Sequence, residues 1–147
     1  MTSATVQTVR IVFGTDEETP LTQTVIEELR SRRHDVEHVA VGEAWPEVGR
    51  AVGDAVASGR ADRGVVCCWT GTGVSMAANK VPGVRAALCT DAATADGARR
   101  WNDANVLAFG LRLTSPQVAR EMLDAFLRGE PDDAERAVIS RLEEPSR

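Results

Sequence analysis

The sequence predicts an α/β fold: an open five-stranded parallel sheet between two layers of helices, a Rossmann-like three-layer αβα arrangement with a C-terminal helix. Apolar strand-like segments alternate with amphipathic helix-like segments from end to end. Several strands read as continuous apolar runs, which is typical of parallel strands covered on both faces. The 147 residues match one ordinary domain, and no internal repeat interrupts the pattern. We therefore expect 1–147 to form a single domain.

The elements follow in a regular order. The expected strands are 9–16, 35–42, 63–69, 84–90 and 105–112. The expected helices are 20–33, 46–59, 73–80, 93–103, 115–127 and a C-terminal helix within 131–147. Residues 1–8 are expected to be a loose tail.

Punctuating residues support these helices. The first helix has one apolar face and ends in a basic cluster suited to a helix C-terminus. Its apolar face consists of Leu21, Val25, Ile26 and Leu29. Pro46 opens the second helix and Gly59 closes it. Ser115, directly before Pro116, is the expected N-cap of the fifth helix.

Composition excludes several functions. The net charge of −5 and the pI near 5.1 leave no basic stripe for nucleic acid. No apolar run approaches the ~18 residues needed to cross a bilayer, and the start resembles no signal peptide. The three cysteines suit a reducing compartment, so a cytoplasmic location is expected. No cluster of metal ligands is visible, and neither a metal nor a cofactor is expected.

The stretch VVCCWTGTG combines two cysteines with a glycine turn where the third strand gives way to a helix. Gly71, Thr72 and Gly73 could direct backbone N–H groups into the crevice outside the strand ends, as an anion or oxyanion cradle. A plain structural turn is the alternative. The turn is no dinucleotide fingerprint, since Met76 replaces the third glycine, and no GK[ST] follows as in a Walker loop.

Strand alternation places Cys67 and Cys68 on opposite faces of the sheet. Cys67 and Cys89 are expected in the core. Cys68 lies nearer the strand end, where the helix N-terminus would favour a thiolate. Its alternative interpretation is a small buried hydrophobe.

These residues carry a family resemblance. The segment from CCWTGTGVSMAANKVPGVRAAL to WNDANVLAFGLRL resembles the ribose-5-phosphate isomerase B and galactose-6-phosphate isomerase family, over residues 57–112. That family reads CGTGxGxSIAANKxxGIRAAL and HNDANVLALGxR there. It interconverts aldose and ketose phosphates through an enediol. The resemblance also implies a homodimer, or a dimer of dimers, with sites shared between subunits.

The resemblance assigns roles residue by residue. It implies that Cys68 is the base and that Thr70 assists proton handling. The backbone of 71–73 would hold the oxyanion. The implied substrate contacts are Asp16 and Asn102, with Arg112 for the phosphate.

This chain departs from the family pattern inside the site. Trp101 replaces the histidine thought to open the sugar ring, and an indole cannot act as a general acid or base near neutral pH. Glu17 stands where the family has a histidine, Trp45 where it has a tyrosine, and Trp69 where it has the glycine after the cysteine. Of the usual C-terminal pair of arginines, only Arg136 remains, with Asp132 in the other position.

The sequence therefore predicts an aldose–ketose isomerase of a small phosphorylated sugar, a pentose or tetrose phosphate. Loss of the ring-opening histidine favours an open-chain substrate such as a tetrose phosphate. The three tryptophans suggest an aromatic-lined pocket. Two alternatives stay open: a catalytically incomplete binding or partner subunit of the same fold, and a redox switch at Cys68.

Overall fold

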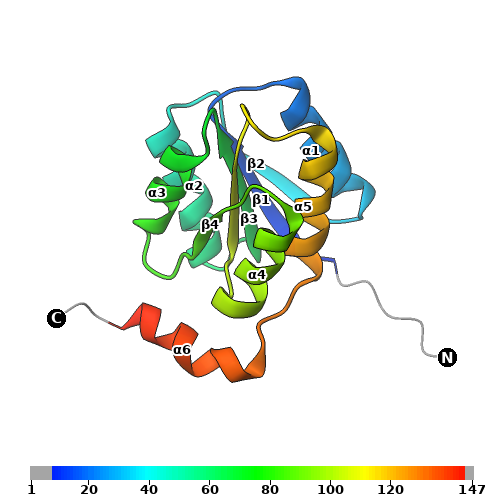
Figure 1. The fold of residues 1–147 in the computed structure, drawn as a ribbon. Coiled ribbons are helices and arrows are strands. Elements are labelled where there is room, and N and C mark those ends of the chain that lie inside the picture. Colours follow the sequence, from blue (N-terminus) through cyan, green and yellow to red (C-terminus); the bar gives the residue numbers. More distant parts are fainter. Residues whose placement is uncertain (1–7, 145–147) are drawn as a thin grey trace.

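A computed structural model describes residues 8–144 of the chain and has the α/β architecture that the sequence predicts (Figure 1). Five parallel strands form one sheet in the order β2-β1-β3-β5-β4. The strands are β1 (Arg10–Thr15), β2 (Asp35–Val41), β3 (Arg63–Cys68), β4 (Ala86–Leu88) and β5 (Val106–Gly110). The main helices are α1 (Pro20–Ser31), α2 (Trp45–Ala57), α3 (Thr72–Asn79), α4 (Ala92–Asn102) and α5 (Pro116–Arg128).

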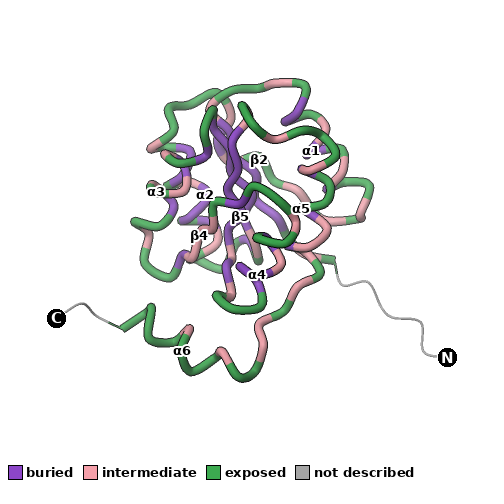
Figure 2. The backbone as a smooth tube through the Cα atoms, viewed as in Figure 1, coloured by how far each residue is buried: buried purple, intermediate pink, exposed green. Residues whose placement is uncertain are grey.

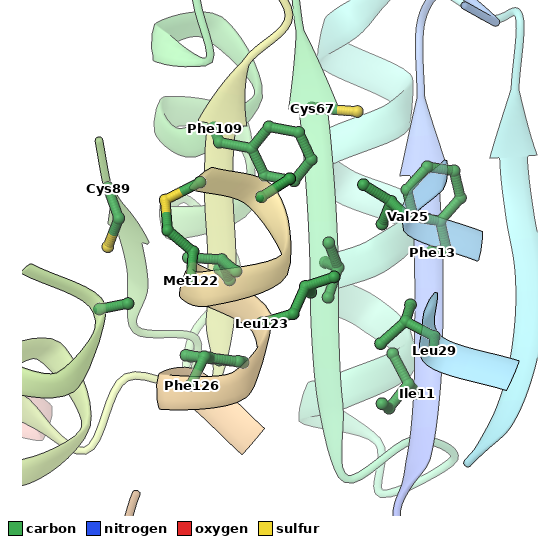
Figure 3. Packing of buried hydrophobic residues seen from close by; sticks show 14 of the residues in the cluster. Ile11, Phe13, Val25, Leu29, Cys67, Cys89, Phe109, Met122, Leu123 and Phe126 are labelled. Atoms are coloured by element: carbon green, nitrogen blue, oxygen red, sulfur yellow. The ribbon is translucent and has the colours of Figure 1, made fainter. Parts of the chain in front are cut away.

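The helices cover the two faces of the sheet unequally. Buried residues of α2 and α3 form one core cluster with one face of β1, β3 and β5. Buried residues of α1, α4 and α5 form the other cluster, which contains the three phenylalanines Phe13, Phe109 and Phe126 (Figure 3). The central strands are buried along their length, whereas the outer helix faces are exposed (Figure 2). This is the expected three-layer arrangement.

Side-chain caps begin most of the long helices. Ser115 accepts a hydrogen bond from the Val118 amide at 3.2 Å, which confirms the expected cap of α5. Thr19 and Asp91 cap α1 and α4 in the same way. These hydrogen bonds satisfy amides that precede the first intrahelical bond.

The C-terminal helix is present but short. It is α6 (Arg136–Ser140), between the 3₁₀ turns η1 (Asp133–Glu135) and η2 (Arg141–Glu143). Its apolar side chains find little to pack against, since Val138 and Leu142 are 56% and 67% exposed. A helix without tertiary packing gains little from propagation, which explains why it is shorter than expected.

The edge strand is shorter than expected, and the ends of the chain lie outside the described residues. Of the expected loose tail, residues 1–7 lie outside the described residues, as do 145–147. The edge strand β4 has 3 residues, fewer than the expected 84–90. Between residues 8 and 144, no helix combines the length and the apolar character that a membrane crossing requires.

Candidate active site

The glycine turn after β3 is built for close approach to the neighbouring strand. Gly71 has a positive φ of 79°, and a Cβ there would lie 2.6 Å from the backbone carbon of Phe109 and 2.8 Å from the Gly110 amide. The first intrahelical bond of α3 runs from the Ser75 amide to the Gly71 carbonyl. The amides of residues 72–74 therefore precede that bond.

No side chain among the described residues caps these amides, in contrast to the starts of α1, α4 and α5. Uncapped amides at a helix N-terminus attract negative charge. The turn therefore presents uncapped amides at 72–74, whereas the Gly71 amide is bonded to Cys68, and anion binding by the predicted cradle at 71–73 stays a prediction.

Cys68 ends β3 beside this turn. Its Sγ atom accepts a hydrogen bond from the Gly71 amide at 3.2 Å, and the residue is 5% exposed. Cys67 lies on the opposite face, fully buried among Phe13 and Phe109, as predicted from strand alternation (Figure 3). Burial raises the pKa of Cys67 to about 12 and that of Cys89 to about 11, so both thiols stay protonated in the core. Of the three, only Cys68 is bonded to the cradle.

A carboxylate lies at the end of the neighbouring strand. β1 pairs with β3 so that Thr15 is opposite Cys67, and Asp16 follows at the level of Cys68. The Oδ1 atom of Asp16 is buried and has no hydrogen-bond partner among the described residues. Desolvation, with a smaller effect from the charge of Glu17, raises the Asp16 pKa. A buried acceptor without a donor is costly, and a ligand hydroxyl group would satisfy it.

Two hydroxyl groups face each other across the turn. The Oγ1 atoms of Thr70 and Thr72 are 2.8 Å apart, and both residues are exposed. This spacing is that of a good O–H···O hydrogen bond.

A pocket of about 260 Å³ opens beside Thr70, at the carboxyl ends of β3, β4 and β5. Trp69 and Arg112 line it, and the Arg112 amide donates to the Trp69 carbonyl at 2.9 Å. The remaining lining residues are Leu88, Cys89, Thr90, Gly110, Leu113 and Thr114. Trp69 is 56% exposed, so its indole is available to a ligand.

Trp45 lies on the other side of the turn. A Cβ at Gly73 would be 2.8 Å from the Trp45 Cδ2 atom, which places the indole against the first turn of α3. Trp45 also borders a groove of about 560 Å³ between α2 and α3, together with Met76 and Lys80. Two of the three tryptophans thus flank the cradle.

Three predicted site residues lie elsewhere in the same chain. The helix α4 runs antiparallel to the strands and ends at Asn102. The Asn105 carbonyl, three residues on, accepts from the Gly64 amide near the start of β3, so α4 ends near the strand starts. Trp101 packs against Gly97 of α4. Asn102 borders a pocket of about 580 Å³ at the amino end of β4, whereas the cradle lies at the carboxyl end of β3. Arg136 begins α6, at the bottom of the view in Figure 1, and bonds Asp133 at 3.0 Å. Within one chain, Trp101, Asn102 and Arg136 are therefore at the opposite edge of the sheet from Cys68.

The comparison with known families decides which family the chain belongs to. The family model described as Ribose/Galactose Isomerase matches residues 11–143, nearly the whole described chain. The chain belongs to the ribose/galactose isomerase family. The resemblance inferred from the sequence motifs is confirmed.

Individual members of the ribose/galactose isomerase family agree with this assignment. The chain is 37% identical over 141 residues to the galactose-6-phosphate isomerase subunit LacB of Clostridium acetobutylicum, covering 91% of this chain and 82% of that protein. It is 36% identical over 120 residues to D-erythrulose-4-phosphate isomerase 2 of Mycolicibacterium smegmatis, covering 77% and 79%. The structure of Clostridium thermocellum ribose-5-phosphate isomerase B matches with a TM-score of 0.86 and 35% identity, covering 91% and 95%. This chain is thus a sugar-phosphate isomerase of the family.

One family motif has a structural explanation that sequence reasoning missed. Asn79, in the AANK block, donates from Nδ2 to the Ala86 carbonyl at 2.9 Å and accepts from the Ala86 amide at 2.8 Å. It anchors β4 to the end of α3. Sequence reasoning also missed Leu88 and Leu113 as pocket-lining residues, because only tertiary packing brings them to the turn. Thr90, the last residue of the fourth expected strand, lies at the strand end that the sequence predicts to face the crevice.

Proposed function

We propose that this chain is an aldose–ketose isomerase of an open-chain, four-carbon sugar phosphate, with Cys68 as the base. The observation that carries the proposal is the hydrogen bond of 3.2 Å from the Gly71 amide to the Cys68 Sγ atom. It joins the one thiol at the strand end to the start of the anion cradle. An amide donor next to sulfur stabilises the thiolate form that a base requires.

The proposed reaction begins with removal of the C2 proton of the aldose by the Cys68 thiolate. The electron pair of the C2–H bond forms the C1–C2 double bond, and the carbonyl electrons move to O1. The amides of 72–74 stabilise the resulting enediolate oxygen. Asp16 accepts a hydrogen bond from a sugar hydroxyl. O1 then gains a proton as O2 loses one, and the thiol returns the carbon proton to C1, which gives the ketose.

Trp101 supports a substrate that needs no ring opening. It stands where the family resemblance places the ring-opening histidine, and its indole N–H can donate a hydrogen bond but cannot act as a general acid or base near neutral pH. In a tetrose with phosphate on O4, the oxygen that would close a five-membered ring is esterified, so the sugar is open-chain. The relative from Mycolicibacterium smegmatis carries the name of such a substrate, D-erythrulose 4-phosphate.

The test is deuterium exchange at C2 in deuterated water, with erythrose 4-phosphate, ribose 5-phosphate and galactose 6-phosphate supplied as separate substrates. We expect exchange and isomerisation with the tetrose phosphate and at least about 100-fold slower exchange with the others. Cys68→Ala should abolish exchange, while Cys67→Ala, on the opposite face of the sheet, retains it. Equal rates on ribose 5-phosphate, or exchange by Cys68→Ala at the parental rate, would contradict the proposal.

A gain of function tests the role of Trp101. Trp101→His should restore a group that can open a furanose ring, and so raise kcat/KM for ribose 5-phosphate relative to the tetrose phosphate. Trp101→Phe is the matched control, because it removes the indole without adding an acid–base group. An equal gain with phenylalanine would show that space, and not proton transfer, limits the pentose.

We further propose that the working unit is a homodimer whose sites draw residues from both subunits. The placement of Trp101, Asn102 and Arg136 at the opposite sheet edge from Cys68 supports this arrangement. Cys68→Ala and Arg136→Ala, each inactive or impaired alone, should complement when mixed under subunit exchange. Half of the dimers are then mixed, and one of their two sites is intact, so activity should approach a quarter of the parental value. Absence of recovery in verified mixed dimers would place each site within one chain.

A further inference from the structure

The side-chain hydroxyl of Thr72 forms a hydrogen bond that is separate from the backbone amides of the cradle. Its hydroxyl bonds the Thr70 hydroxyl at 2.8 Å, and both residues are exposed beside Cys68. Threonine at the start of a helix usually bonds backbone amides. Among the described residues, no side chain caps α3, so these two hydroxyls face each other instead. Each retains hydrogen-bonding capacity for a ligand.

The proposed isomerisation requires a second proton transfer that Cys68 does not perform. The thiol moves a proton from C2 to C1. For the ketose to form, O2 must also lose its proton and O1 must gain one. The proton can pass directly between the two oxygens, through solvent, or through a protein group within reach of both, and the third route keeps it inside the site.

We propose that Thr72 joins Thr70, whose part in proton handling the family resemblance already implies, to form a two-hydroxyl proton relay between O2 and O1 of the enediol intermediate. This inference rests on the proposed function. The O2–H proton passes to the Thr72 Oγ1 atom, the Thr72 proton passes to the Thr70 Oγ1 atom, and the Thr70 proton passes to O1. Both threonines end as neutral hydroxyls, and no further reactant is needed.

The spacing of the two hydroxyls suits this relay. In a cis-enediol, O1 and O2 lie on adjacent carbons, about one hydrogen-bond length apart. The Thr70 and Thr72 oxygens are 2.8 Å apart. Two such pairs facing each other close a ring of four oxygens in which every neighbour is within hydrogen-bond reach. A concerted transfer around that ring avoids a charged threonine.

The relay also fits the position of Cys68. The Gly71 amide that bonds the thiol lies between the two threonines in the chain, so all three groups border one turn. The carbon proton and the oxygen proton would thus be handled on the same side of the intermediate. Thr72 is then a catalytic residue through its side chain as well as its backbone.

The test measures two products of one intermediate. An enediolate formed from the aldose returns to aldose without any oxygen proton transfer, and in deuterated water it then carries deuterium at C2. Conversion to ketose needs the relay. We expect Thr72→Val to lower kcat for isomerisation by about 100-fold, the lower end of the contribution of a positioned acid–base group. C2 exchange should persist with KM nearly unchanged, so the ratio of exchange to isomerisation rises.

Two variants separate this role from a structural one. Thr72→Ser keeps the hydroxyl and should restore the parental ratio. Thr94→Val, in the first turn of α4 and also exposed, should change neither rate. If Thr72→Val keeps the parental ratio, the relay is wrong, whether or not KM changes. If the parental protein exchanges none of the sugar phosphates, the proposed function fails and the relay falls with it.

Discussion

Replacement of Gly71 by alanine tests whether the cradle depends on the close approach of the turn to β5. Two costs are expected. The positive φ of 79° places any residue with a Cβ in the left-handed region, at roughly 1–2 kcal/mol. The new Cβ would also lie 2.6 Å from the Phe109 backbone carbon. Such overpacking against backbone costs about 1–3 kcal/mol. The two together lower the free energy of unfolding by about 2–5 kcal/mol.

Gly59→Ala is the matched control for this substitution. Its φ is 81°, but a Cβ there meets nothing within 4 Å, so only the conformational cost applies. Urea denaturation of both variants should give a difference of about 1–3 kcal/mol, with Gly71→Ala the less stable. Gly71→Ala should also lose C2 exchange, because the shifted amide no longer meets the Cys68 sulfur. Equal destabilisation of the two variants would refute the close-approach argument.

Four other substitutions test separate features. Asp16→Asn should raise stability at pH 7. The folded-state pKa of Asp16 is raised, so the ionised carboxylate destabilises the fold above that pKa, and the gain should shrink as the pH falls through it and disappear by about pH 4. The pKa of Asp62 is lowered by its bond to Arg10, so Asp62→Asn should show the opposite sign in the same pH series of thermal melts. Asn79→Ala should speed amide hydrogen exchange in β4, since both of its bonds to that strand are lost. Arg63→Met should cost about 1–3 kcal/mol in urea denaturation, because Arg63 donates to the last carbonyls of α5 at 2.6 and 3.1 Å.

Local sequence patterns predicted much of this structure because their causes are local. Alternation along β3 separates Cys67 from Cys68 whatever surrounds the strand. The Ser115 cap needs only the backbone three residues ahead. The two glycines after an apolar strand likewise predicted a tight turn, and Gly71 has the positive φ that glycine adopts without strain.

Features that depend on strand order were harder to predict. β5 inserts between β3 and β4, and this insertion brings Leu88 and Leu113 to the turn beside Trp69. Nothing in the local pattern distinguishes that order from a sequential one. The length of the C-terminal helix was missed for a related reason: its extent depends on what covers Val138 and Leu142, not on its own periodicity.

The contacts of Asp132 weaken one reason for the alternative that this chain is a catalytically incomplete partner subunit. The similarity to the galactose-6-phosphate isomerase subunit LacB is a separate reason to test that alternative. Asp132 stands where the family resemblance places the second C-terminal arginine. Its carboxylate instead pairs with Arg100 at 3.3 Å, and the Asp132 amide donates to the Arg100 carbonyl at 2.9 Å. The negative charge is therefore largely matched within the chain. Trp101 is then the substitution that separates an isomerase of open-chain sugars from a subunit without catalysis of its own. A purified homodimer that isomerises a tetrose phosphate but not a pentose phosphate would decide for the enzyme.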